Sequence, residues 1–371
     1  MESITYDKLF KGIYKNKTVL VTGHTGFKGS WLCYWLIKMG AKVIGYSLEE
    51  NTKPNHFSLL NLDMTSIYSD IRDIEKLNNV FKEYQPDIVF HLAAQPLVRL
   101  SYISPVTTFE TNMMGTINIL EVIRKNNKKI AILNITSDKC YENNESKLGY
   151  VEDDKLSGYD PYSASKACSE IITSSYRDSF FNLDKYNDSH RVLVSSCRSG
   201  NVIGGGDWNE DRIIPDIIKA ITKNKILEIR NPKSTRPWQH VLEPLSAYLL
   251  LGQKLLESKK EYAKAWNFGP KDDKSTSVEE LVLNIKKYWS KLEYKIIDNK
   301  NILHETNFLK LDSSQAYKEL SWQTVWDIEK TFNRTISWYK KYYEKNIINT
   351  SKDLDEYIFS AKEKRLEWTN D

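Results

Sequence analysis

Thr18-Val19-Leu20-Val21-Thr22-Gly23-His24-Thr25-Gly26-Phe27-Lys28-Gly29 is the stretch that decides the fold. It opens with a short apolar run, which is typical of a strand buried on both faces of a parallel sheet. Glycines follow at positions 23, 26 and 29, and residues 31–39 then show the apolar spacing of a helix. A strand, a glycine-rich turn and a helix in this order form a cradle for phosphate, because the helix N-terminus offers free N–H groups.

Each glycine of this cradle has its own expected task. Gly23 permits the tight turn, Gly26 lets the backbone approach a pyrophosphate, and Gly29 lets the helix pack against the strand. We expect Thr25 and Phe27, which lie between them, to contact the same cofactor. The spacing Gly-x-x-Gly-x-x-Gly resembles that of the short-chain dehydrogenase/reductase superfamily. An ordinary glycine-rich turn is the alternative interpretation.

Strands and helices alternate outward from the cradle through the first half of the chain. Expected strands are 42–47, 87–94, 130–135 and 191–197, and expected helices are 74–84 and 111–125. This alternation predicts an α/β fold with a doubly wound, Rossmann-like parallel sheet. We place the NAD-binding domain at 12–200, a smaller substrate-binding lobe at 201–345 with some chain crossing back, and a C-terminal helix or tail at 346–371.

Size and composition exclude several classes of protein. The 371 residues are 40% apolar and carry a formal charge of +4, and they include no long Lys/Arg run. We therefore expect about two lobes, no nucleic-acid partner and no membrane partner, since no stretch reaches the roughly 18–20 apolar residues of a membrane span. The N-terminal residues lack an apolar signal core, which favours a cytoplasmic protein. Four widely spaced cysteines indicate reduced core thiols and no metal site, namely Cys33, Cys140, Cys168 and Cys197.

The end of the second expected strand bears on the choice between NAD and NADP. The dinucleotide fingerprint expects an acidic residue here, but the strand ends at Ser47. Ser47 can hydrogen-bond a ribose hydroxyl. Glu49 and Glu50 follow at once and would repel a 2′-phosphate, so we favour NAD.

Two further segments resemble cofactor contacts of the same superfamily. Asp70 and Ile71 resemble its adenine-binding strand end, with the Asp70 carboxylate accepting from the adenine amino group. Leu92, Ala93 and Ala94 resemble the wall of small residues beside the cofactor. A charge at a helix N-terminus is the alternative interpretation of Asp70.

An acid/base pair is predicted on a helix that begins near residue 161. Asp160 is a preferred N-cap and Pro161 a preferred first helical residue, so Tyr162 and Lys166 share one helix face. A cation near the phenol lowers its pKa and fits Tyr162 to remove a hydroxyl proton, while Lys166 can also bond the nicotinamide ribose. This is the YxxxK signature of the short-chain superfamily. A surface pair is the alternative.

Thr136-Ser137-Asp138-Lys139 follows the expected strand 130–135, at the sheet edge where ligands bind. We expect Ser137 to bond a substrate 4-hydroxyl, and Asp138 and Lys139 to supply an acid and a base. A dehydrogenase or simple epimerase needs neither, whereas a 4,6-dehydratase needs both. Oxidation at C4 acidifies the C5 hydrogen, a base removes it, an acid protonates the leaving 6-hydroxyl, and hydride returns to C6. A polar loop is the alternative.

Over about residues 12–345 the chain resembles the CDP-glucose branch of the nucleotide-sugar 4,6-dehydratases. The matching segments are 23–32, 91–99, 136–141, 160–163, 200–208 and 236–244. The dTDP-glucose dehydratases are similar but carry Thr-Asp-Glu where this chain has Ser137-Asp138-Lys139. The resemblance implies NAD as cofactor, a nucleotide sugar as substrate with CDP-glucose favoured, Asp138 as acid and Lys139 as C5 base. It also implies a role in deoxysugar synthesis for lipopolysaccharide O-antigens. Ser157 and Ser199 depart mildly from the family pattern.

The second lobe offers two candidate substrate ligands. Asn201 follows a strand end and can bond the substrate phosphate or sugar, and the guanidinium of Arg236 pairs well with pyrophosphate. His240 is expected to be structural. Extended short-chain enzymes often pair through a helix like the one bearing Tyr162, so we expect a homodimer or higher homo-oligomer. An epimerase or reductase on nucleotide sugars, and a non-catalytic dinucleotide-binding regulator, remain alternatives.

Overall fold

A computed structural model describes residues 4–126, 128–146, 148–270, 276–297 and 308–369. Seven parallel strands form one sheet in the order β11-β6-β5-β4-β1-β2-β3. Their bounds are β1 (Thr18–Thr22), β2 (Lys42–Ser47), β3 (Thr65–Tyr68), β4 (Ile88–His91), β5 (Ile130–Ile135), β6 (Val192–Ser199) and β11 (Ala265–Phe268). The expected doubly wound α/β fold is confirmed.

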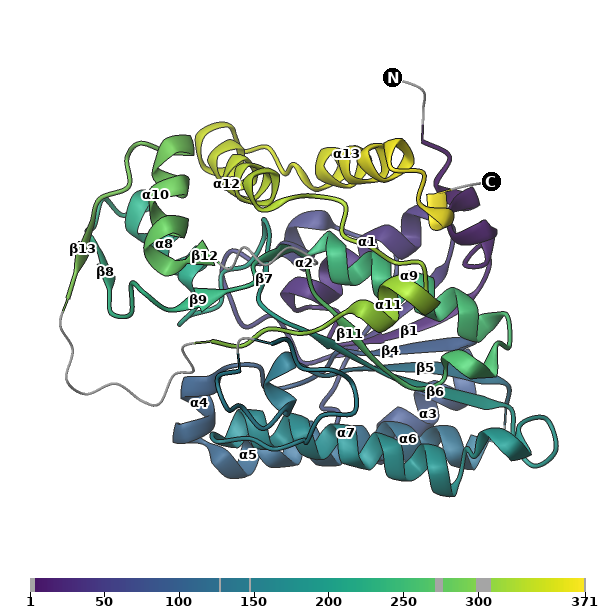
Figure 1. Cartoon of the computed structure of the whole chain (residues 1–371). Coiled ribbons are helices and arrows are strands. Elements are labelled where there is room, and N and C mark those ends of the chain that lie inside the picture. Colours follow the sequence, from purple (N-terminus) through teal and green to yellow (C-terminus); the bar gives the residue numbers. More distant parts are fainter. Residues whose placement is uncertain (1–3, 127, 147, 271–275, 298–307, 370–371) are drawn as a thin grey trace.

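Helices cover both faces of this sheet (Figure 1). One layer contains α3 (Ile74–Tyr84), α6 (Gly115–Asn126) and α7 (Pro161–Ser179), and the other contains α1 (Phe27–Lys38) and α9 (Leu242–Leu256). Alternate residues of a strand point to opposite faces, so Val19 and Val21 join the core under α1 while Leu20 joins the core under α6. All three side chains are buried, as expected for a parallel sheet.

Short helices connect these layers. They are η1 (Tyr6–Gly12), α2 (His56–Leu60), α4 (Val98–Ile103), α5 (Pro105–Phe109), η2 (Glu110–Met114), η3 (Asp138–Cys140), η4 (Leu183–Lys185) and η5 (Lys260–Tyr262). The expected strand 87–94 ends earlier, at His91, and β3 was not anticipated. No helix within the described ranges is both long and apolar enough to span a bilayer.

The second lobe is built from two separate stretches of chain, with α9 (Leu242–Leu256) and the sheet strand β11 between them. After β6 the chain runs outward through β7 (Val202–Ile203), α8 (Ile213–Thr222), β8 (Leu227–Ile229), β9 (Thr235–Arg236) and β10 (Gln239–His240). It returns for α9 and β11, and leaves again as β12 (Thr276–Ser277), α10 (Val278–Tyr288) and β13 (Tyr294–Ile296). Strands β10–β7, β12–β9 and β13–β8 pair two by two. Residues 242–268 therefore belong spatially to the cofactor half.

The C-terminal segment packs against the first half of the molecule. It contains α11 (Ser314–Glu319), α12 (Ile328–Lys345), α13 (Thr350–Glu363) and η6 (Glu367–Thr369). The Trp368 ring stacks on Phe10 with centroids 5.1 Å apart, and Glu367 pairs with Lys254 at 3.0 Å. Residues 346–369 thus form a docked helix with a short helical end; residues 370–371 of the expected tail lie outside the described part.

Candidate active site

One cavity of about 830 Å³ opens at the carboxyl ends of the central strands. It lies between the sheet and the second lobe, where open α/β sheets bind ligands. Every site residue predicted from the sequence lines it: Gly23, Thr25, Gly26, Phe27, Gly29, Asp70, Ile71, Leu92, Ala93, Ala94, Ser137, Asp138, Lys139, Tyr162, Lys166, Asn201 and Arg236. The fold therefore brings together residues from the whole length of the first 240 positions.

The glycine turn has the shape of a phosphate cradle. Gly23 has a φ of +75°, and a Cβ at Gly29 would lie 2.1 Å from the Gly23 carbonyl oxygen, so both positions require glycine. A Cβ at Gly26 would lie 3.4 Å from its nearest neighbour, the Gly23 carbonyl oxygen, and Gly26 lines the cavity. Gly26 is the N-cap of α1 and supplies no side-chain cap. The helix end facing the cavity therefore suits a pyrophosphate.

The two segments expected to contact the ribose and the adenine both line the cavity and carry polar groups. The Thr25 hydroxyl lies 2.9 Å from the Ser47 hydroxyl and 3.0 Å from the Leu48 carbonyl oxygen. Asp70 accepts from Arg72, with 2.8 Å between Nη2 and Oδ2, and this hydrogen bond holds the pKa of Asp70 below its ordinary value. Asp70 is thus a paired carboxylate at the cavity wall, and its contact with adenine remains a prediction.

Tyr162 and Lys166 lie on the first turns of α7. The Asp160 carboxylate caps this helix by accepting from the Ser163 N–H at 2.9 Å, as the sequence predicted. Burial raises the pKa of Tyr162 to about 12, although a hydrogen bond with Ser137 opposes the rise. Burial also lowers the pKa of Lys166 to about 8, and its amine donates to the Ile135 carbonyl oxygen at 3.2 Å.

The lowering of the Tyr162 pKa that the sequence predicts is opposed by burial. Tyr162 is only 8% exposed, and removal from water disfavours the phenolate more strongly than the surrounding groups favour it. The role of Tyr162 as a base stays a prediction.

The Asp138 turn lies directly opposite this pair. Ser137 caps η3 by accepting from the Lys139 N–H at 3.2 Å, and its hydroxyl donates to Asp138 Oδ1 at 3.0 Å. Asp138 is only 4% exposed, and burial raises its pKa, while the charge of Lys139 opposes the rise. A carboxyl that keeps its proton to higher pH suits a general acid.

Asn201 and Arg236 stand at the border between the sheet and the second lobe. The Asn201 carbonyl oxygen accepts from the Gln239 N–H at 3.1 Å, which ties the segment after β6 to the lobe. Arg236 donates to the Thr235 carbonyl oxygen at 2.8 Å, and its charge lowers the pKa of Asp138. Arg236 is therefore close to the reacting end of the cavity.

Among the cations of the cavity that sequence reasoning missed are Lys28 and Arg212. The Lys28 amine lies 2.9 Å from the Ser199 hydroxyl, and burial, followed by the charges of Arg212 and Lys166, lowers its pKa to about 7. The signal for Lys28 was a lone lysine between the second and third glycines of the motif. Arg212 carried no signal, because only the folding of the lobe brings it to the cavity.

Several groups outside the cavity have structural surroundings. His240 is fully buried and packs its ring against Trp326 at 4.8 Å and Trp31 at 6.0 Å, as expected for a structural histidine. The four cysteines form no disulfide, and three of them are buried. The described residues place no three His, Cys, Asp or Glu side chains where they would hold a metal ion.

Comparison with known proteins agrees with this geometry. The family model described as GDP-mannose 4,6 dehydratase matches residues 20–335. The chain is 46% identical to CDP-glucose 4,6-dehydratase of Salmonella typhimurium strain LT2 over 352 residues, covering 94% of this chain and 98% of that protein. Identity to dTDP-glucose 4,6-dehydratase of the same strain is 26%, covering 86% and 92%.

Solved structures show the same fold at low identity. A dTDP-glucose 4,6-dehydratase from Bacillus anthracis in complex with NAD superposes with a TM-score of 0.73 at 21% identity, covering 89% of this chain and 98% of that one. A UDP-glucose 4-epimerase from Stenotrophomonas maltophila with bound NAD superposes with a TM-score of 0.77 at 19% identity, covering 89% and 99%. Dehydratases and epimerases thus share this scaffold.

Proposed function

This chain belongs to the nucleotide-sugar 4,6-dehydratase family, and we propose that it converts CDP-glucose to CDP-4-keto-6-deoxyglucose. The observation that carries the proposal is the Ser137-Asp138-Lys139 turn, with Ser137 and Asp138 buried and Lys139 half-buried, in one cavity with Tyr162. An epimerase or a dehydrogenase has no use for an added acid and base at this place. The 46% identity to a CDP-glucose enzyme supports cytosine as the base of the substrate nucleotide.

The cofactor is NAD, and the cavity residues fit it. Gly23, Gly26 and the N-terminus of α1 would hold the pyrophosphate, and Asp70 with Ile71 would line the adenine end. Leu92, Ala93 and Ala94 would border the nicotinamide ring on the sheet side, and Lys166 would hydrogen-bond the nicotinamide ribose. When bound, NAD supplies an acceptor for the C4 hydride, a donor for C6 and a positive charge.

The first half of the reaction oxidises C4 of the sugar. Ser137 hydrogen-bonds the 4-hydroxyl and holds it toward Tyr162, which removes its proton. Lys166 lies one helical turn from Tyr162, and its charge favours the phenolate once ligands fill the cavity. The residues thus convert a hydroxyl into a carbonyl at C4.

The second half removes water across C5 and C6. The new C4 carbonyl acidifies the C5 hydrogen, which Lys139 takes as base. Asp138 donates its proton to the 6-hydroxyl, so that water leaves and a C5–C6 double bond forms. The raised pKa of Asp138 keeps that proton available near neutral pH. Asn201 and Arg236 hold the phosphates of the nucleotide at the lobe.

We also propose that the enzyme is a homodimer or a higher homo-oligomer. Exposed apolar side chains gather on α4, α5 and α7, where Ile103 is 77%, Val106 68% and Ile171 55% exposed. Such a surface is typical of a protein interface. Free cysteines support a cytoplasmic location. Use of the product in deoxysugar and O-antigen synthesis is proposed from the family resemblance.

The test is incubation of the purified protein with CDP-glucose, dTDP-glucose, UDP-glucose and GDP-mannose, followed by the ultraviolet signature of a 4-keto sugar in base. We expect product from CDP-glucose, with no net release of NADH. Comparable kcat/KM for dTDP-glucose would contradict the cytidine preference. A 4-epimer formed without a keto product would contradict the dehydratase itself.

A further inference from the structure

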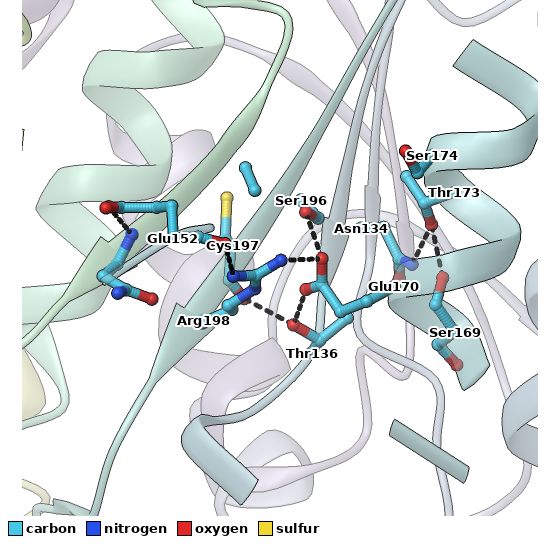
Figure 2. A network of polar contacts seen from close by, with 12 residues as sticks. Asn134, Thr136, Glu152, Ser169, Glu170, Thr173, Ser174, Ser196, Cys197 and Arg198 are labelled. Carbon is cyan, nitrogen blue, oxygen red and sulfur yellow. Dashed lines mark hydrogen bonds and ion pairs between the residues drawn. The ribbon is translucent and has the colours of Figure 1, made fainter. Parts of the chain in front are cut away.

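A buried ion pair lies behind the Ser137-Asp138-Lys139 turn, on the side away from the cavity. Arg198 of β6 and Glu170 of α7 are joined at 2.8 Å between Nη2 and Oε2, and their side chains are 4% and 2% exposed (Figure 2). Neither residue lines the cavity. The pair therefore cannot touch substrate, and the mechanism above makes no use of it.

Glu170 accepts a hydrogen bond from Thr136, the residue that precedes the turn. Its Oε1 accepts a short hydrogen bond from the Thr136 hydroxyl, and its Oε2 accepts from the Ser196 hydroxyl at 2.6 Å in addition to Arg198 (Figure 2). Thr136 is the first residue after β5 and is bonded directly to Ser137. Glu170 itself stands one helical turn beyond Lys166 on α7. The carboxylate thus links the start of the turn to the helix bearing the acid/base pair.

Arg198 hydrogen-bonds Tyr141, the residue that follows η3. Its Nη1 donates to the Tyr141 hydroxyl at 2.5 Å and to the Glu152 carbonyl oxygen at 2.7 Å. The guanidinium also lies 4.9 Å from the centre of the Tyr141 ring, and the Tyr141 hydroxyl donates to Asn267 at 2.9 Å. Tyr141 comes directly after η3. The ion pair therefore holds both ends of the four-residue segment 137–140.

Charge is retained in this buried place. Burial works against it, but Arg198 holds the pKa of Glu170 below its ordinary value, and Glu170 raises the pKa of Arg198. A buried ion pair adds little net stability compared with apolar residues of equal volume, because both ions lose their hydration. What such a pair supplies is a defined arrangement of its neighbours, since every donor and acceptor has a fixed direction.

We propose that Glu170 and Arg198 are positioning residues that fix Asp138 and Lys139 at C5 and C6 of the sugar, and so serve the elimination half of the reaction. This rests on the proposed dehydratase function. Oxidation at C4 uses one group of the segment 137–140, the Ser137 hydroxyl, while Tyr162 and Lys166 are held by α7. Elimination depends more strongly on the contacts at Thr136 and Tyr141, because both its acid and its base lie between those two residues.

Two variants each remove one hydroxyl that hydrogen-bonds the ion pair, without leaving a buried charge unpaired. They are Thr136→Val and Tyr141→Phe; Ser196→Ala is the matched control, because it removes a hydrogen bond to the same carboxylate but does not adjoin the turn. In single turnovers with CDP-glucose, absorbance at 340 nm reports oxidation, and formation of the 4-keto-6-deoxy product reports elimination. Nuclear magnetic resonance follows exchange of the C5 hydrogen with heavy water.

We expect Thr136→Val and Tyr141→Phe to slow elimination and C5 exchange by about 10²-fold, the loss typical when a catalytic group is displaced by about 1 Å. Oxidation should slow much less than elimination, because only Ser137 of the displaced segment takes part in it, so bound NADH accumulates. Ser196→Ala should leave this balance unchanged, and Thr136→Ser, which keeps the hydroxyl, should restore elimination. Urea unfolding measures stability separately for each variant.

Equal loss of both half-reactions, or no loss of either, would overturn the inference. So would a Ser196→Ala variant that slows elimination as much as Thr136→Val, because the pair would then act only through general stability. A wild-type protein that forms no keto product from any nucleotide sugar would instead refute the proposed function, and the inference would fall with it.

Discussion

Two glycines of the cradle are expected to fail in different ways when each is replaced by alanine. In Gly29→Ala the added Cβ would lie 2.1 Å from the Gly23 carbonyl oxygen and 2.8 Å from the His24 Cα. Both neighbours are backbone atoms, so the turn itself must move. In Gly26→Ala the nearest atom is 3.4 Å away, and the backbone angles of φ −78° and ψ 170° suit alanine.

The magnitudes follow from these contacts. Overpacking costs up to about 3 kcal/mol, and alanine regains about 1 kcal/mol inside a helix. Gly29→Ala should therefore lower the free energy of unfolding by about 2 kcal/mol. Gly26→Ala should leave that free energy within about 0.5 kcal/mol, since the strain-free gain of a Gly→Ala change and the loss of a preferred N-cap glycine nearly cancel. Its methyl group instead occupies cavity space meant for pyrophosphate.

The assay separates stability from cofactor binding. Urea unfolding without NAD gives the stability of each variant, and calorimetric titration gives the Kd for NAD. We expect Gly26→Ala to bind NAD about 10- to 100-fold more weakly, which corresponds to about 1.4–2.7 kcal/mol. A Gly26→Ala protein with wild-type affinity for NAD would refute the assignment of the cradle. A Gly29→Ala protein as stable as wild type would refute the packing argument.

Three further predictions concern the cavity. Tyr162→Phe should fold and bind NAD but lose about 10²–10⁴-fold in turnover, the usual contribution of a general base; a wild-type rate in steady-state assays would remove Tyr162 from the mechanism. Lys139→Met should oxidise CDP-glucose and accumulate bound NADH at 340 nm, and should stop C5 exchange with heavy water; normal exchange would mean that another residue is the base. Because the pKa of Lys28 is lowered to about 7, the unfolded chain binds more protons than the folded one between pH 7 and about 10.4, so stability rises with pH across this window. Lys28→Met should therefore be more stable than wild type in urea at pH 7, and its advantage should shrink by pH 9; a constant difference would contradict the lowered pKa of Lys28.

Local signals in the sequence were enough to predict much of the fold. Strands β2 and β5 and helix α3 have the predicted bounds, because a buried parallel strand is a short apolar run and the caps of a helix are local. β3 was missed since its side chains are half-buried or exposed at the sheet edge and show no apolar run. The cavity residues were found where a strand end or a helix start placed them.

Properties that depend on burial were beyond the sequence. The spacing of Tyr162 and Lys166 predicts that they lie side by side. It does not predict the loss of hydration that raises the pKa of the phenol. The Glu170–Arg198 pair joins residues 28 positions apart on a helix and a strand, and no motif announces it. The role of each predicted site residue stays a prediction until the variants above are measured.

The place of β11 has a consequence for synthesis of the chain. β6 pairs with β5 on one side, and its other edge is filled only by Ala265–Phe268, with Ala265 opposite Ser196. A ribosome working at about 5–20 residues per second needs several seconds to synthesise residues 200–264, which separate β6 from β11. Throughout this interval the free edge of β6 presents unpaired backbone N–H and C=O groups, the kind of surface on which chains aggregate. Chaperone protection is therefore needed most while the first part of the lobe is emerging, and a shortened protein ending near residue 200 would carry that bare edge permanently.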